Sequence, residues 1–403
     1  MEAGVGRRAE MTDDAAPPPP GFGEPSDAFR LLVDGLPSLA GKTLAVTGST
    51  TGTGFVLARE AARKGARVLM LNRPSTRSEA AVERLTPKGA RAGGGVFTAP
   101  AASPKASKAS AQLADETGGS VEHVDCDLTS LASCEAAAAS VLRRVGAAGL
   151  DVLCCNAAVM HHADLVTADG FDVQMQTNML GHHVLVCRLW PALAAAAERR
   201  GEARVVMHSS AARYMDGRGS GMFFLPRWCR KLQPESFERH ADGELGGEGW
   251  PVPGKALLFH GPKQSRYQQS KLANFVYAYA LRDRCASAGS KVKALVAHPG
   301  ICQTQLFANG PKKHGYSGIR VGELFFPIFM MSLDDGAQAI IRCCCDGEVA
   351  SGDFFGPGQP MWPLTFWGAA ERQEPERWLI TQDQKDLVVA KCAEATGVAL
   401  DIS

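Results

Sequence analysis

The sequence has 403 residues, of which 45% are hydrophobic and 21% are charged, and its formal net charge is +1. These values are typical of a globular protein with an ample apolar core. A net charge near zero argues against a nucleic-acid-binding protein and against one attracted to an anionic membrane. No apolar run is long enough to cross a bilayer, so we expect a soluble protein without a membrane span.

The N-terminal segment does not resemble a targeting signal. Residues 1–25 include the acidic pair Asp13-Asp14 and the prolines Pro17–Pro20, and they lack the apolar centre of a signal peptide. We expect residues 1–40 to form a disordered or partly helical extension, with a short helix over Ser26–Leu36 capped by Ser26 or Asp27. A cytoplasmic location is expected, and import into an organelle is left open.

Short β-rich runs alternate with longer helical stretches from Gly41 onward. The expected strands, in chain order, are Leu44–Thr47, Val68–Leu71, Val121–Val124, Asp151–Cys155, Arg204–His208 and Val292–Ala297. The expected helices are Phe55–Lys64, Leu131–Val145, Phe171–Ala197 and Tyr267–Ala286. This alternation predicts an α/β fold, a single Rossmann-type doubly wound parallel sheet with helices on both faces. We expect one domain over residues 41–403.

Three stretches interrupt the alternation. Residues 92–111 are rich in Gly, Ala, Ser, Pro and Lys, which predicts a surface insertion. Residues 307–326 form a shorter irregular piece. The long excursion over residues 213–265 carries aromatic side chains, among them Trp228 and Trp250. It is either a lid over a substrate pocket or a surface elaboration with no catalytic role.

The cysteines and paired histidines favour packing over metal binding. Cys154-Cys155 and Cys343–Cys345 lie in apolar runs and cannot bridge between neighbours, which predicts free buried thiols. His161-His162 and His182-His183 have no carboxylate or cysteine at ligand spacing, so no metal site is expected. Cys302 is either a redox-sensitive thiol or an inert neighbour, and the lack of a basic partner favours the inert one.

A glycine-rich turn, Thr47-Gly-Ser-Thr-Thr-Gly-Thr-Gly54, joins the first expected strand to the helix after it. Its glycines permit a tight turn and close approach of a pyrophosphate to the N–H groups that open the helix. Such a turn alone is a weak signal, because glycine ends strands in many folds. Its position between a buried strand and a helix predicts a dinucleotide site.

The dipeptide Asn72-Arg73 ends the second expected strand. NAD-binding folds usually place a carboxylate there to hold the ribose hydroxyls. Here a guanidinium follows instead, which suits the 2′-phosphate of NADP. The alternative is that Arg73 is an ordinary surface arginine.

Tyr267 and Lys271 are four residues apart, so they share one face of their helix. An ammonium close to a phenol lowers the pKa of that phenol towards the working pH of a general acid/base. Ser209-Ser210 ends the fifth strand, at the sheet edge where ligands bind, and a hydroxyl there can hydrogen-bond a substrate carbonyl.

These motifs, taken in order, resemble the short-chain dehydrogenase/reductase family, in its retinol dehydrogenase-like and protochlorophyllide reductase-like branch. The likeness runs from about Lys42 to the C-terminus. Its motifs are the glycine-rich turn, with Thr53 where the family has an aliphatic residue, Cys126-Asp127-Leu128, Asn156-Ala157-Ala158, with Ala158 in place of a glycine, Asn178-Met-Leu-Gly181, Ser210, Tyr267-Gln-Gln-Ser-Lys-Leu-Ala-Asn274, and His298-Pro299-Gly300 followed by Thr304.

The resemblance implies a role for each matching residue. Tyr267 exchanges the substrate proton, Lys271 lowers its pKa and holds the nicotinamide ribose, Ser210 polarises the carbonyl, and Asn178 steadies a proton-relaying water. The residues expected at the cofactor are Gly48, Ser49, Thr50, Gly52, Thr53, Gly54, Asn72, Arg73, Asp127, Leu128, Asn156, Ala157, Tyr267, Lys271, Pro299, Gly300 and Thr304.

The expected function is an NADP(H)-dependent oxidoreductase, using NADP(H) rather than NAD(H), on a small carbonyl or alcohol substrate. The substrate is expected to be apolar, like a retinoid, steroid or lipid aldehyde. Two alternatives stay open: a light-dependent protochlorophyllide-type double-bond reductase, and a non-catalytic NADP(H)-binding sensor or scaffold. No nucleic-acid partner is expected, and homo-oligomerisation is left open.

Overall fold

The structure is a computed structural model that describes residues 24–85, 118–160, 165–214, 231–240, 245, 262–302, 330–361 and 364–402. Most of the N-terminal extension, the expected insertion at 92–111, the irregular piece at 307–326, and much of the 213–265 excursion lie outside these ranges. His161-His162 and Thr304 also lie outside them.

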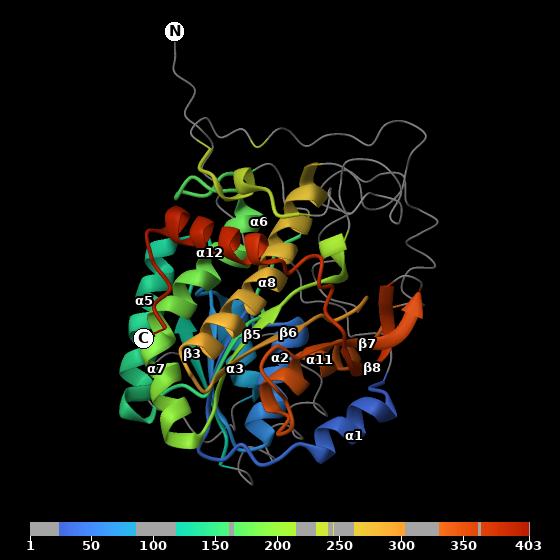
Figure 1. The fold of residues 1–403 in the computed structure, drawn as a ribbon. Coiled ribbons are helices and arrows are strands. Elements are labelled where there is room, and N and C mark those ends of the chain that lie inside the picture. Colours follow the sequence, from blue (N-terminus) through green and yellow to red (C-terminus); the bar gives the residue numbers. More distant parts are fainter. Residues whose placement is uncertain are drawn as a thin grey trace.

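One eight-stranded sheet forms the centre of the molecule (Figure 1). Its strands are β1 Thr43–Thr47, β2 Arg67–Asn72, β3 Ser120–Asp125, β4 Val152–Cys155, β5 Ala203–His208, β6 Val292–Ala297, β7 Phe354–Met361 and β8 Leu364–Gln373. They lie in the order β3-β2-β1-β4-β5-β6-β7-β8. Every neighbouring pair is parallel except β7 and β8. The order reverses between β1 and β4, which is the point where doubly wound sheets bind ligands.

Helices cover both faces of this sheet (Figure 1). One face packs against α5 Leu131–Val145, α7 Gly181–Arg200, α8 Pro262–Ser287 and α12 Gln382–Thr396. The other face packs against α1 Asp27–Gly35, α2 Gly52–Arg63, α3 Thr76–Leu85 and α11 Leu333–Cys345. Alternate strand residues serve the two layers, as in β5, where Val205 and Met207 face the first and Val206 faces the second. The predicted doubly wound fold is therefore confirmed.

All six predicted strands are present, but the sheet is larger than the sequence indicated. β7 and β8, which the sequence patterns did not predict, form an antiparallel hairpin at its edge. Pro357 and Pro360 lie within β7, and prolines inside a run argue against a strand unless it is irregular or at an edge. The register of the hairpin shifts between Pro357 and Pro360, which accommodates them.

The predicted helix over Phe171–Ala197 is divided into three parts. The short α6 spans Val173–Met175, a π turn spans Gln176–Leu180, and α7 follows without a break. The predicted N-terminal helix is confirmed, with the Ser26 side chain accepting a hydrogen bond from the Phe29 N–H. π turns are rare in proteins, but those that occur often lie at functional sites. Asn178 lies inside this one.

Part of the 213–265 excursion is built into the core. Residues 231–240 include the 3₁₀ turn Pro234–Phe237, and Leu232 and Phe237 are buried against the cluster that contains α12. The Leu232 N–H donates to Gln384 Oε1 at 2.7 Å, and the Gln233 N–H donates to Gln269 Oε1 at 2.9 Å. Leu232 and Phe237 therefore belong to the core, and residues 231–240 are anchored beside the first half of α8.

We expect Leu232→Ala to lower the free energy of unfolding by about 2–3 kcal/mol, since it removes a buried side chain and leaves a cavity. Urea denaturation measures the change. Leu31→Ala is the matched control, because Leu31 is 73% exposed and its loss should cost little. Equal effects in the two variants would contradict the anchoring of this segment.

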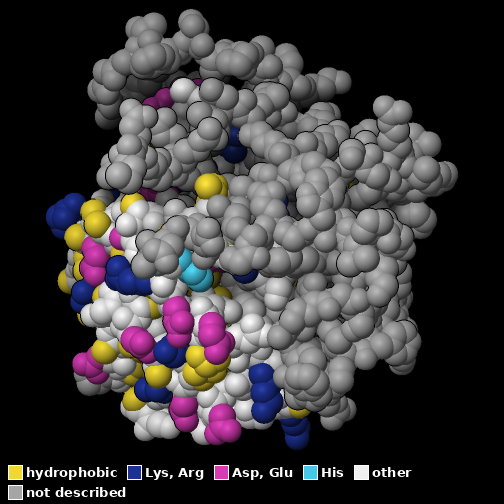
Figure 2. Space-filling model, turned by 90° about the horizontal axis from the view of Figure 1, so that it is seen from above, with side chains coloured by type: hydrophobic (Ala, Val, Ile, Leu, Met, Phe, Trp, Pro, Cys, Tyr) yellow, Lys and Arg dark blue, Asp and Glu magenta, His cyan; other side chains and the backbone are white. Residues whose placement is uncertain are grey.

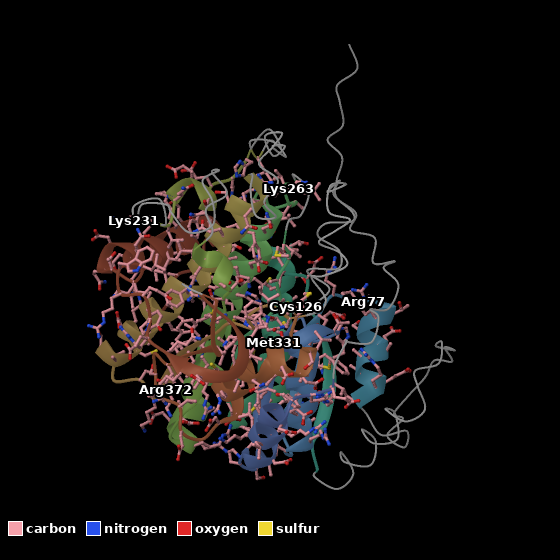
Figure 3. The ribbon with its side chains drawn as sticks, turned by 90° about the vertical axis from the view of Figure 1, so that its right-hand side faces the viewer. Arg77, Cys126, Lys231, Lys263, Met331 and Arg372 are labelled. Atoms are coloured by element: carbon pink, nitrogen blue, oxygen red, sulfur yellow. The ribbon has the colours of Figure 1, made fainter. Side chains whose placement is uncertain are left out.

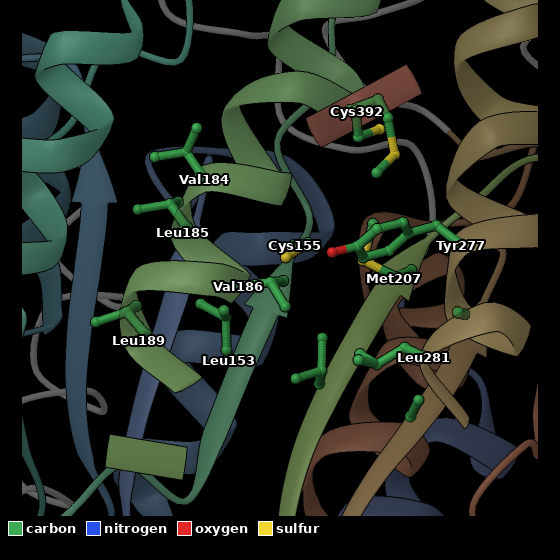
Figure 4. Close-up of a cluster of buried hydrophobic side chains, with 14 of the residues drawn as sticks. Leu153, Cys155, Val184, Leu185, Val186, Leu189, Met207, Tyr277, Leu281 and Cys392 are labelled. Carbon is green, nitrogen blue, oxygen red and sulfur yellow. The ribbon is translucent and has the colours of Figure 1, made fainter. Parts of the chain in front are cut away.

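The first apolar layer is densely packed. Figure 4 shows the Tyr277 ring between Met207 and Cys155, its hydroxyl pointing from α8 towards α7.

On the face seen from above, the described surface mixes Lys and Arg with Asp and Glu side chains (Figure 2). Among the described helices, none has the length and hydropathy needed to cross a membrane.

Candidate active site

The four residues expected to carry the chemistry come from three elements that meet at the carboxyl edge of the sheet. Asn178 lies in the π turn before α7, Ser210 directly follows β5, and Tyr267 and Lys271 lie on α8. Because α8 begins at Pro262, Tyr267 is in its second turn rather than at its head. A side-chain hydrogen bond joins Ser210 to Tyr267.

Asn178 forms hydrogen bonds with both the loop after β4 and α8. Its Oδ1 accepts from the Val159 N–H at 2.8 Å, and its Nδ2 donates to the Val159 carbonyl at 3.0 Å and to Ser270 Oγ at 2.9 Å. Its backbone carbonyl accepts from His182 Nδ1 at 2.9 Å and from Asn274 Nδ2 at 2.7 Å. Protein partners therefore engage both lone pairs of this carbonyl and both ends of the amide. The water-holding role of Asn178 stays a prediction.

Tyr267 is buried, and burial raises the pKa of its phenol above the ordinary value of 10, although the hydrogen bond from Ser210 acts in the opposite direction. This differs from the sequence expectation that Lys271 would lower that pKa. The physical reason is that burial disfavours the charged form of both groups, phenolate and ammonium alike. The neutral phenol is the dominant form at neutral pH.

Lys271 is also buried, and burial lowers its pKa to about 7. Its Nζ donates to the His208 carbonyl at 2.8 Å, which fixes the amine at the end of β5. A lysine with a pKa near neutrality exchanges protons readily at physiological pH. The pair thus combines a neutral phenol with an amine whose charge is sensitive to pH.

The glycine-rich turn packs closely against the loop after β4. Gly48 has a φ of +64°, and a Cβ at this position would lie 2.7 Å from the Cα of Ala157. A Cβ on Gly54 would collide with the amide of Asn156. Thr53 Oγ1 donates to Asn156 Oδ1 at 3.1 Å. The predicted cofactor residues after β1 and β4 are therefore in direct contact.

The last residue of β2 and the residue after it differ in burial. Asn72 Oδ1 accepts from the Ser49 N–H at 2.8 Å, so this side chain fastens the glycine-rich turn. Arg73, the next residue, is half-buried. Arg84 on α3 donates to the Thr50 carbonyl at 2.9 Å and lies over the Phe55 ring. Arg84 was not among the predicted site residues, because its position in a helix gives no signal of this contact.

The remaining predicted positions also follow strand ends. Asp127 Oδ1 accepts from the Thr129 N–H at 2.9 Å and hydroxyl at 2.7 Å, which shapes the turn into α5, and Leu128 is buried. Figure 3 places Arg77, on α3, at about the height of Cys126, which follows β3. Pro299 and Gly300 follow β6, with a φ of +67° at Gly300.

Two histidines that are not among the predicted site residues, His182 and His208, also lie at this edge. His182 belongs to a pair first interpreted as packing, yet it contacts Asn178. His208 directly precedes Ser209-Ser210. Its Nδ1 hydrogen-bonds Asn156 Oδ1 at 2.9 Å, while its buried Nε2 has no hydrogen-bond partner in the part of the chain that the structure describes. Burial lowers the pKa of His208 well below its ordinary value.

Metal binding and disulfides find no support in the described part of the chain. No group of three or more His, Cys, Asp or Glu side chains there could hold a metal ion. All eleven cysteines within it are free, and only Cys187 is not fully buried. Burial raises the pKa of the Cys302 thiol to about 12, which makes it unreactive near neutral pH.

Comparison with known proteins identifies the class. The short chain dehydrogenase family profile matches residues 88–222. Mouse retinol dehydrogenase 14 is 30% identical over 321 residues, which cover 78% of this chain and 78% of that protein. The uncharacterized oxidoreductase C736.13 of Schizosaccharomyces pombe is 29% identical over 279 residues, 68% of this chain but 65%, less than two thirds, of that protein.

A crystal structure of an uncharacterized protein from Mycobacterium paratuberculosis matches with a TM-score of 0.59 and 25% identity, covering 92% of this chain and 98% of that one. The chain therefore belongs to the short-chain dehydrogenase/reductase family of oxidoreductases. Within that family it belongs to the retinol dehydrogenase-like branch.

Proposed function

We propose that this protein transfers hydride between NADP(H) and a carbonyl or alcohol substrate of apolar character, such as a retinoid-, steroid- or lipid-aldehyde-like molecule. The observation that carries the proposal is the convergence of Asn178, Ser210, Tyr267 and Lys271 at the carboxyl edge of the sheet. The likeness to mouse retinol dehydrogenase 14 supports the apolar substrate class.

The chain's own residues supply binding, polarisation and a proton. The Ser210 hydroxyl, joined to Tyr267 by a hydrogen bond, binds the substrate oxygen and polarises the carbonyl. The Tyr267 phenol, kept neutral by burial, donates a proton to that oxygen during reduction. Lys271, with a pKa of about 7, returns a proton to the phenolate. Asn178 holds the loop after β4 and the helix that carries both residues.

The residues at the turn fit a dinucleotide. Gly48 has a positive φ and packs against Ala157 with no room for a side chain, and α2 begins at Gly52 directly after this turn, so the N–H groups that open the helix are suited to a phosphate. The buried Nε2 of His208 has no hydrogen-bond partner among the described residues. When bound, the nicotinamide supplies or accepts the hydride. The turn from Gly48 to Gly54, together with Arg73, Asp127, Asn156, Tyr267, Lys271 and Gly300, would hold the nucleotide.

We expect Arg73→Ala to raise the KM for NADPH by about tenfold to hundredfold, because a charge-assisted bond of about 1.5–3 kcal/mol to the 2′-phosphate is lost. The KM for NADH should hardly change. Steady-state kinetics with both nucleotides measures the effect. Arg188→Ala is the control, since Arg188 pairs with Glu135 on the outer side of α7. A wild-type preference for NADH would refute the choice of NADP(H).

The proposed function is tested by turnover of a panel of aldehydes, ketones and alcohols with NADPH and NADH side by side. Reduction of bulky apolar carbonyls with NADPH is the expected result. Light-dependent turnover of protochlorophyllide alone would instead favour the double-bond reductase. Tight NADPH binding without any turnover would favour a sensor or scaffold. We further propose that residues 41–403 act as one oxidoreductase domain.

A further inference from the structure

Two neighbouring histidines, His182 and His183, are fully buried in the first turn of α7. We propose that His182 is a positioning residue that holds Asn178 in place, as a neutral imidazole with its proton on Nδ1, and ties it to the glycine-rich turn through Thr47. The inference rests on the proposed function, because Asn178 belongs to the expected catalytic set. His183 makes no such connection.

Asn178 lies in the π turn Gln176–Leu180, where the Gly181 N–H donates to the Gln176 carbonyl five residues earlier. Two side chains donate to the Asn178 carbonyl, His182 Nδ1 at 2.9 Å and Asn274 Nδ2 at 2.7 Å. One donor comes from α7 and the other from α8, so the carbonyl joins the two helices.

The contacts of His182 define its tautomer. A carbonyl can only accept, so the Nδ1 that faces Asn178 must carry the proton. Burial lowers the pKa of His182 to about 4, and the ring is therefore neutral at neutral pH. Its Nε2 is then an acceptor, and it lies 2.9 Å from Thr47 Oγ1.

The Thr47 hydroxyl completes a directed chain. It accepts the N–H groups of Asn156 and Ala157, each at 3.0 Å, which occupy both of its lone pairs. Its proton therefore points to His182 Nε2, since the alternative acceptor, the Cys154 carbonyl, is farther away at 3.3 Å. The chain runs from the loop after β4, through Thr47 and His182, to Asn178.

Asn178 in turn hydrogen-bonds residues that border the active site. Its amide clamps Val159 at both the N–H and the carbonyl, and it donates to Ser270, the residue before Lys271. Loss of the His182 bond would remove one of the two side chains that hold the Asn178 carbonyl and would loosen that clamp. Small displacements of this kind lower kcat more than they weaken substrate binding.

The protein contains a matched control. His183 is equally buried, and burial lowers its pKa to about 4 as well. Its Nδ1 and Nε2 hydrogen-bond the Tyr277 hydroxyl at 2.9 Å and the Val398 carbonyl at 2.8 Å. Both partners lie in the packed layer below α12 rather than at the edge of the sheet. A change at His183 therefore disturbs packing to a similar degree without touching Asn178.

Replacing His182 by Asn or by Gln tests its two hydrogen bonds one at a time. The amide of Asn lies near the place of Nδ1, so His182→Asn retains a donor to Asn178. The longer Gln reaches the place of Nε2, so His182→Gln retains the contact with Thr47 and loses Asn178. We expect kcat to fall about tenfold to hundredfold in His182→Gln, with KM nearly constant, and to stay within about threefold of wild type in His182→Asn and His183→Gln.

Two measurements on the full-length chain need no turnover. Long-range ¹H–¹⁵N spectra should show His182 protonated on Nδ1 alone, with no titration between about pH 6 and 8. Hydrogen exchange at the Val159 N–H should be faster, about tenfold or more, in His182→Gln only. An Nε2-protonated ring, or equal kcat losses in His182→Gln and His183→Gln, would overturn the proposal. Lack of turnover in the wild type would count against the proposed function, while the Val159 exchange would still report whether His182 holds Asn178.

Discussion

Replacing Tyr267 by Phe is expected to lower kcat by about 10²–10⁴-fold, because the phenol is the group that gives or takes the substrate proton. The ring stays in place, so nucleotide binding should be retained within a few-fold. Steady-state kinetics together with a direct nucleotide titration measures the two effects separately. Near-normal kcat in this variant would remove Tyr267 from the mechanism.

Tyr277→Phe is the matched control for this substitution. Tyr277 lies on the same helix and is equally buried, but its hydroxyl hydrogen-bonds His183 and points into the packed layer towards α7 (Figure 4). We expect Tyr277→Phe to lose about 1 kcal/mol of stability, the typical net value of a buried hydrogen bond, with kcat unchanged. A comparable loss of turnover in both variants would point to general damage to α8.

The direction of the Tyr267 pKa shift adds a pH dependence. Burial raises this pKa above 10, so the phenol stays protonated throughout the neutral range. Carbonyl reduction needs the protonated form and should not lose activity through deprotonation of Tyr267 below about pH 9. Alcohol oxidation needs the phenolate, and its rate should rise as the pH increases into the alkaline range.

The sequence predicted that these motif residues lie at one edge of the sheet, because the motifs follow strand ends. In a parallel sheet these ends meet at one edge, so residues such as Asn156 after β4 and Ser210 after β5 are brought together once the strands are recognised. The spacing of Tyr267 and Lys271 likewise needs only a helix. These inferences depend on local pattern and topology, which single sequences carry.

Other features depend on tertiary contacts that pattern analysis does not carry. No residue type distinguishes the π turn at Asn178, which is stabilised by Asn274 from α8 and His182 from α7. The pKa of Tyr267 depends on complete burial, and spacing to Lys271 alone gave the wrong direction. Leu232 is held in the core by its contact with α12, a helix that lies about 150 residues later in the chain.

Lys271→Met is expected to abolish most turnover and, at the same time, to stabilise the protein at neutral pH. The amine is fully buried, and its folded-state pKa of about 7 lies below the ordinary value of 10.5. Between these two pH values the unfolded chain binds a proton that the folded chain does not. The stability of the wild type therefore rises with pH through this window, and the penalty for burying the ammonium is fully present below pH 7.

Met has a similar length and no charge, so the variant avoids this penalty, although the His208 carbonyl loses its donor. At pH 7 we expect a net gain on the order of 1–3 kcal/mol in the free energy of unfolding, from roughly 1.4 kcal/mol per unit of pKa shift less the lost bond. The gain should shrink as the pH rises from 7 to 10.

Urea denaturation of wild type, Lys271→Met and Tyr267→Phe across this pH range measures the gain. Tyr267→Phe should keep the wild-type slope because it keeps Lys271. If the wild type and Lys271→Met showed parallel pH profiles, Lys271 would have an ordinary pKa and the pH-sensitive amine would have to be abandoned. A lysine that destabilises the protein in which it is buried is readily understood as a catalytic group, because function rather than folding then accounts for its position.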